Sequence, residues 1–74
     1  MTIQDILTRG AESLAADLKT ALDGVYLEEE YNGRQVKLTK DITGYHVTLT
    51  NPDLELRPKG ALRAVQTIKS ELGL

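Results

Sequence analysis

Polar and apolar side chains alternate along two short runs that flank Asn32-Gly33. The apolar positions of these runs are Val25, Leu27, Tyr31, Val36 and Leu38. Alternation with a period of two is typical of β-strands that bury one face. Asn-Gly favours a two-residue turn, because its positive φ angles and its twist suit the strands on either side. The pattern therefore predicts an antiparallel hairpin that closes at residues 32–33.

The two-residue turn also fixes which side chains face each other across the hairpin. It places Leu27 opposite Leu38 on an apolar face, and Glu28 opposite Lys37 on a polar face. A slip of one residue would move every side chain to the other face, so this register is well specified. We expect helices to cover the face of Leu27 and Leu38, and water to cover the other face.

A third strand is predicted after the turn at residues 41–44, where Gly44 supplies the left-handed residue of a four- or five-residue loop. If Lys40 pairs with Tyr45 across this loop, Leu38 faces Val47. The second turn then continues the apolar face that the first turn defines. Two independent turns agree, which predicts a three-stranded meander.

Helical spacing of apolar residues marks both ends of the chain. Residues 3–22 predict one helix that tolerates Gly10 in its interior and ends at Gly24. Residues 54–56 are expected to be a linker or the stub of a fourth strand. Pro58 favours the first turn of a second helix. The expected buried stripe of that helix is Ala61, Leu62, Val65, Ile68 and Leu72.

The element order is thus α-β-β-β-α in a single domain that spans residues 1–74. A half-polar antiparallel sheet with two amphipathic helices predicts a two-layer α+β fold, with both helices packed on one face of a three-stranded antiparallel meander. A chain this short has a small core, and it has no cysteine for a disulfide. A homodimer that covers part of the apolar surface is therefore plausible.

The residue inventory argues against catalysis. The chain has no cysteine and one histidine, His46, and the predicted register places no serine beside it. A nucleophile–base pair therefore lacks a member, and a metal site lacks its convergent ligands. We expect no catalytic residue, no cofactor and no metal site.

No apolar stretch approaches the roughly 20 residues that span a bilayer, and the first residues do not resemble a signal peptide. We therefore expect a cytoplasmic protein that does not enter a membrane.

Charge is distributed unevenly along the chain. Residues 1–31 carry seven acidic and two basic side chains, a net charge of −5, whereas residues 32–74 carry a net charge of +3. The run Glu28–Glu30 is the densest cluster of charge. It is either an acidic patch for a basic partner or a charged guard that keeps an edge strand from pairing with another sheet.

The polar face of the meander is the first candidate for a binding surface. The register places Tyr26 opposite Thr39 on this face, where it could stack with a ligand. The predicted site consists of Tyr26, Glu28, Glu30, Lys37, His46 and Thr48. These residues favour a small noncatalytic protein–protein interaction module (a regulator, an adaptor or a phage-type inhibitor) that acts through its open sheet face and charged edges.

The alternative is a nucleic-acid-binding domain. Arg57, Lys59 and Arg63 gather near the predicted start of the last helix, where a helix already attracts anions. Arg57 or Lys59 could instead pair with Asp53 or Glu55, or remain solvated. The α-β-β-β-α order, with Lys59 and Arg63 near that helix start, resembles the order in double-stranded-RNA-binding domains and implies phosphate contacts there. The tight turn at residues 32–33 replaces that family's histidine-containing loop, and its lysine cluster is reduced here.

Overall fold

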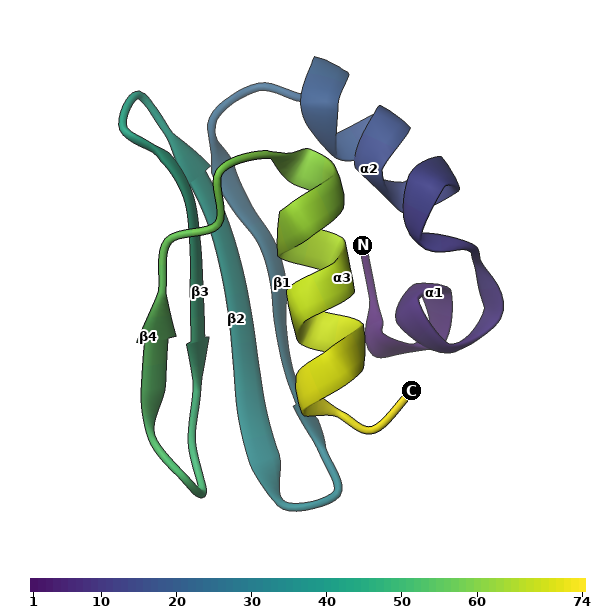
Figure 1. Ribbon diagram of the computed structural model, residues 1–74, viewed down its shortest axis with the longest axis vertical. Helices are drawn as coiled ribbons and strands as arrows, with labels where there is room; N and C mark the ends of the chain where they lie inside the picture. The colour runs from purple at the N-terminus through teal and green to yellow at the C-terminus, as the bar shows by residue number, and fades with distance from the viewer.

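The computed structural model describes residues 1–74 and contains three helices and a four-stranded antiparallel sheet (Figure 1). The helices are α1 (Ile3–Thr8), α2 (Ala11–Thr20) and α3 (Ala61–Glu71). The strands are β1 (Gly24–Tyr31), β2 (Arg34–Asp41), β3 (Gly44–Leu49) and β4 (Leu54–Leu56), and they lie side by side in the order β1-β2-β3-β4. The α+β class and the antiparallel sheet predicted from the sequence are confirmed.

The hairpin of β1 and β2 has the predicted turn and register. Asn32 and Gly33 adopt φ angles of 51° and 80°, as a two-residue turn of this kind requires. Leu27 pairs with Leu38, and both side chains are buried. Glu28 pairs with Lys37, and both are exposed. The inward and outward faces of the sheet are therefore those that the sequence predicts.

The second hairpin is tighter than expected. Lys40 pairs with Tyr45 as predicted, but the ladder continues to a pair between Asp41 and Gly44. The loop therefore consists of residues 42–43 alone, and not of four or five residues. Gly44, at a φ of 120°, accommodates the sharp reversal.

Residues 54–56 form a fourth strand, so the sheet has one strand more than the predicted meander. Leu56 pairs with Val47, and Leu54 pairs with Leu49. Asn51 adopts a positive φ of 52° at the end of β3 and helps to turn the chain back beside that strand. The interpretation of this segment as a strand stub is the correct one of the two alternatives.

A β-bulge at Tyr26 changes the start of β1. Val25 pairs with Thr39 and Leu27 pairs with Leu38, which leaves Tyr26 as an extra residue in the strand. Its ring packs against the core, and its hydroxyl donates a hydrogen bond to the carbonyl of Leu22. The prediction that Tyr26 lies opposite Thr39 on the open face is therefore wrong, because Val25 takes that place.

The predicted helix over residues 3–22 is two helices. Arg9 and Gly10 both adopt extended backbone, with ψ angles of 149° and 152°, and they separate α1 from α2. The break lets each short helix turn its own apolar side toward the core. Helix α2 ends before the extended Ala21, and Gly24 begins β1 where a helix end was expected.

Helix α3 starts later than the position of Pro58 suggests. Its N-cap is Gly60, so Pro58 lies in the connection before the helix and not in its first turn. The buried side chains are Ala61, Ala64, Val65 and Ile68, at the spacing of one helix face. Leu62, predicted to be buried, is 39% exposed because it lies off this face.

The core lies between the sheet and the helices. Alternate strand residues and the inner faces of all three helices form a single cluster of 14 buried residues. Figure 1 shows the helices on the same side of the sheet, with α2 packed against α3. The opposite side of the sheet is left uncovered, and it carries the polar side chains of the strands.

Candidate functional site

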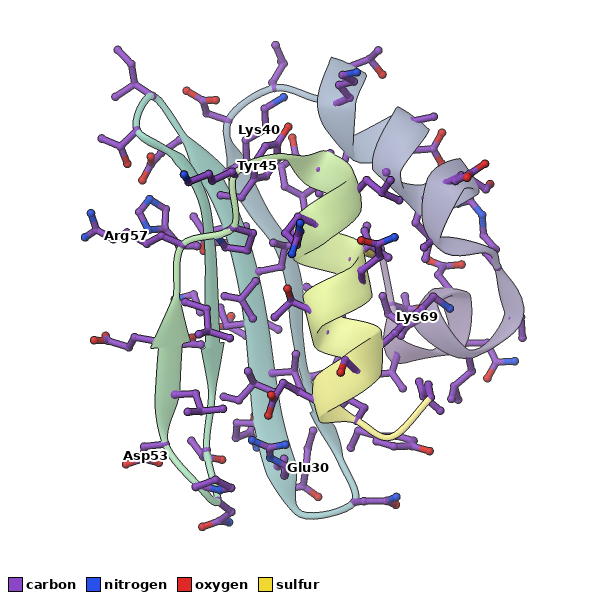
Figure 2. All side chains as sticks on the ribbon, in the orientation of Figure 1. Glu30, Lys40, Tyr45, Asp53, Arg57 and Lys69 are labelled. Carbon is purple, nitrogen blue, oxygen red and sulfur yellow. The ribbon has the colours of Figure 1, made fainter.

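Two lysine side chains donate hydrogen bonds to backbone carbonyls at the carboxyl ends of helices. Lys69 Nζ donates hydrogen bonds to the carbonyls of Ile6 and Arg9, at 2.6 and 2.9 Å, where α1 ends. Lys40 Nζ lies 2.7 Å from the carbonyl of Ala21 and contacts two further carbonyls in the last turn of α2. Carbonyls at the carboxyl end of a helix carry partial negative charge, so both amines neutralise helix ends. Among these carbonyls, that of Leu18 also accepts a hydrogen bond from the backbone N–H of Ala21. Figure 2 labels both lysines.

Arg34 does the same for the third helix. Its Nη1 lies 2.8 Å from the carbonyl of Glu71, the last residue of α3, and its Nε lies 2.8 Å from the carbonyl of Thr50. A further hydrogen bond reaches the carbonyl of Pro52, and Nη1 also forms an ion pair with the Glu71 carboxylate at 3.5 Å. One cation from a distant part of the chain thus caps each helix, and we call Arg34, Lys40 and Lys69 the capping cations.

Two of the remaining cations form ion pairs. Arg9 lies 2.7 Å from Asp17, and Lys37 lies 3.5 Å from Glu28. The last four cations form neither an ion pair nor a side-chain hydrogen bond, and they are Lys19, Arg57, Lys59 and Arg63. The chain therefore leaves four positive charges available to a partner, and none of them is neutralised by Asp53 or Glu55.

The structure separates Arg57 from Lys59 and Arg63, which the sequence grouped together. Lys59 and Arg63 line a hollow of about 690 Å³ between α2 and α3, together with Lys19. Arg57 instead lines a separate hollow beside His46 at the sheet. The division arises because the connection between β4 and α3 carries the chain from the sheet to the helix layer (Figure 1).

Lys19 is a site residue that the sequence did not reveal. It lies on α2, far along the chain from Lys59 and Arg63, and only the packing of α2 against α3 brings the three together. No sequence spacing predicts a helix–helix contact of this kind. We call Lys19, Lys59 and Arg63 the groove cations, and the hollow that they line the α2–α3 groove.

The open sheet face holds most of the other predicted site residues. Glu28, Glu30 and Lys37 are exposed on β1 and β2, and His46 and Thr48 are half-buried on β3. The ion pair of Glu28 with Lys37 and a 3.4 Å hydrogen bond from Gln35 to Glu30 tie neighbouring strands together. Much of the charge on this face is therefore already paired within the sheet.

His46 belongs to a small network at the tip of the second hairpin. Its Nε2 lies 2.8 Å from Thr43 Oγ1 and 3.2 Å from the carboxylate of Asp41. The Thr43 hydroxyl donates its hydrogen to Asp41 at 2.5 Å. In the contact between Thr43 and His46, the histidine nitrogen is therefore the donor and the Thr43 oxygen is the acceptor. Hydrogen bonds from the hydroxyl and the backbone N–H of Thr43, helped by His46, hold the pKa of Asp41 below its ordinary value. The network stabilises the turn.

Three apolar side chains are exposed at one end of the sheet. Ile42 is 96% exposed, Leu22 is 85% exposed and Val25 is 54% exposed. All three lie close to the pair of Gly24 with Lys40, where β1 begins and β2 approaches its end. An isoleucine between Asp41 and Gly44 in a tight turn was the available signal in the sequence. We call Leu22, Val25 and Ile42 the apolar end.

Metal ligands and nucleophiles are sparse among these residues. No group of three or more His, Cys, Asp or Glu side chains is arranged to hold a metal ion. His46 has a threonine and an aspartate beside it, but no serine or cysteine that it could activate. None of the helices has the length and apolar character needed to cross a membrane.

Comparison of the chain with protein-family models, curated proteins and solved structures finds no match.

Proposed function

We propose that this protein is a small noncatalytic interaction module that binds a protein partner through the apolar end and the adjoining open sheet face. The observation that carries the proposal is the exposure of Ile42 and Leu22, with Val25 beside them on the uncovered side of β1. Single exposed apolar residues are ordinary on protein surfaces. Three at one end of a 74-residue chain offer apolar surface that a partner could cover.

The apolar end and its surroundings resemble a protein interface, in which an apolar centre is bordered by polar residues. The register aligns Val25, Thr39 and His46 across β1, β2 and β3. Arg57 lies beside His46 at the edge of this row and has no anionic partner in the chain. The expected partner therefore presents an apolar patch with a carboxylate placed to meet Arg57.

Glu28, Lys37 and Thr48 form the next row of the same face. Because Glu28 and Lys37 already pair with each other, their contribution to affinity is expected to be small. The energy of binding should come mainly from covering the apolar end, where full burial of one isoleucine contributes about 1.5–3 kcal/mol.

Affinity capture with matched variants tests the proposal. The wild-type protein, Ile42→Asn and Leu7→Ser are each immobilised, and partners are recovered from cell lysate and then purified for binding titrations. Asparagine suits a turn and should not disturb the hairpin. Leu7 is an exposed leucine on α1, in the helix layer on the other side of the sheet from the open face, and serves as the control.

The expected result is a partner that binds the wild-type protein and Leu7→Ser equally and binds Ile42→Asn at least about tenfold more weakly. Equal titration of all three proteins would contradict the proposal. Sedimentation of the wild-type protein and Ile42→Asn tests the homodimer, which remains a prediction. Association that Ile42→Asn abolishes would identify the partner as a second copy.

A further inference from the structure

We propose that the α2–α3 groove is a second binding site, separate from the open sheet face, and that its occupant is an acidic amphipathic helix of a protein partner. Three properties of the groove support this assignment: its unpaired positive charge, its small apolar floor, and the change of charge along its length.

Positive charge at the groove has no counterpart within the chain. The groove cations are exposed and take part in none of the four ion pairs, whereas the other lysines and arginines of the helices are paired or capped against carbonyls. Three like charges around one hollow raise the local positive potential and attract a partner of the opposite sign. This holds although the chain as a whole carries a net charge of −2.

The floor of the groove is apolar and shallow. Ala15 and Ala61 are buried in it, and Ala16 and Leu62 remain exposed. Alanine side chains let the helix of a partner approach closely. The exposed Leu62 offers that helix an apolar contact. A groove of this kind accepts the apolar face of an amphipathic helix.

The groove changes charge along its length. Helices α2 and α3 run in roughly opposite directions (Figure 1), so Lys19 at the end of α2 lies toward the start of α3. Glu12 lines the same groove two helical turns earlier, about 10 Å away along the axis of α2. The occupant should therefore carry its carboxylates toward one end, with neutral or basic residues at the end that meets Glu12.

The same gradient argues against a nucleic acid as the occupant. A phosphate backbone repeats negative charge at short intervals along its length, so it would meet Glu12 as well as the groove cations. It would also leave the apolar floor unused. An acidic helix satisfies the charge and the floor together.

Nuclear magnetic resonance titration of the full chain tests the proposal with defined ligands. The first ligand is a synthetic helix of about 14 residues, long enough to follow the groove, with leucine at helical spacing and glutamate toward one end. The second is a scrambled peptide of the same composition. The third and fourth are a single-stranded and a duplex RNA. We expect the amphipathic peptide to bind, with shifts centred on α2 and the first turns of α3.

Two variants give the matched comparison. The double variant Lys19→Glu/Arg63→Glu reverses two groove cations and should weaken binding of the amphipathic peptide by at least about tenfold. Arg57→Glu reverses an equally unpaired cation beside the sheet and should leave this binding unchanged. Thermal unfolding of both variants verifies that each remains folded.

The outcomes separate clearly. Equal binding of the amphipathic and scrambled peptides, shifts outside the groove, or no binding at all would overturn the proposal. Binding of RNA in the groove without binding of the peptide would overturn it in favour of the nucleic acid. Ile42→Asn should not affect peptide binding, so failure of this site and failure of the open sheet face are observed independently.

Discussion

The capping cations and the groove cations are the same types of residue, but the first set has partners within the chain and the second has none. Arg34, Lys40 and Lys69 lie against the carboxyl ends of the three helices, each with two or more carbonyl partners. The groove cations line an open hollow, and their side chains form no ion pair within the chain. The difference teaches that net charge does not measure how much charge a protein offers to a partner.

The two sets differ because the carbonyls at helix ends need hydrogen-bond partners. Each helix leaves carbonyls at its carboxyl end without internal partners, and a nearby cation is stabilising there. The side chain of Arg34 is only 15% exposed, so its charge would be costly without those carbonyls and the nearby carboxylate of Glu71. The exposed groove cations are hydrated and need no partner for the fold to form.

Arg34→Met should give the largest loss of stability. The change removes hydrogen bonds that join β2, the turn at residues 50–52 and the end of α3, and it leaves their carbonyls with poorer partners. We expect the free energy of unfolding to fall by about 1.5–3 kcal/mol. Urea unfolding followed by circular dichroism measures this loss, and an unchanged midpoint would show that water replaces the guanidinium without cost.

Lys69→Met and Lys40→Met should each cost about 1 kcal/mol, since each removes hydrogen bonds to a single helix end, whereas Arg34 joins three parts of the chain. The loss should be local in each case. Hydrogen exchange should increase in α1 for Lys69→Met and at the end of α2 for Lys40→Met. Faster exchange spread evenly over the chain would contradict separate capping roles.

Substitution of the groove cations should hardly affect stability. Lys19→Met and Arg63→Met are expected to change the free energy of unfolding by less than about 0.5 kcal/mol. The same urea titration measures both, with Arg34→Met as the positive control. A loss as large as that of Arg34→Met would mean that the two sets of cations do not differ as the geometry indicates.

The smallest effect concerns Asp41, whose charge serves a turn and no helix end. Because its pKa is lowered in the folded protein, its contribution to stability is present above its ordinary pKa and is lost as the pH falls through the lowered value. Thr43→Val removes the largest cause, the hydroxyl hydrogen bond, and should raise the pKa toward its ordinary value. Carbon-13 titration of the Asp41 carboxyl measures the shift. Thr48→Val, on the same hairpin, is the control and should leave it unchanged.

The β-hairpins were the part of the fold that local chemistry could predict. Asn32-Gly33 has few alternatives to a two-residue turn, and its register then determines the environment of Leu27 and Leu38. The bulge at Tyr26 could not be predicted in this way. An extra residue in a strand leaves no mark in an alternating pattern until a partner strand is placed beside it.

Helix boundaries were predicted less well, for a related reason. Glycine at position 10 is compatible with a helix interior at a modest cost, and the spacing of apolar residues continues across it. In the structure the helix is interrupted there, and the two short helices both contribute buried side chains to the same core.

The candidate surfaces were predicted in part. The sequence placed Glu28, Lys37 and His46 on the open face, and the structure agrees. It grouped Arg57 with Lys59 because the two are neighbours in the chain, whereas the structure assigns them to different hollows. Proximity in sequence was a poor guide where the chain passes from one layer to the other.

By itself, the sequence determined the α+β class, and it determined the register and faces of the first hairpin from Leu27 to Leu38, because turns and alternation act over a few residues. Only the tertiary structure decided which cations cap helices and which remain free. Lys69 reaches α1 from the other end of the chain, and Lys19 joins Lys59 only after α2 packs on α3. Such pairings depend on the packing of distant elements, which no local pattern encodes.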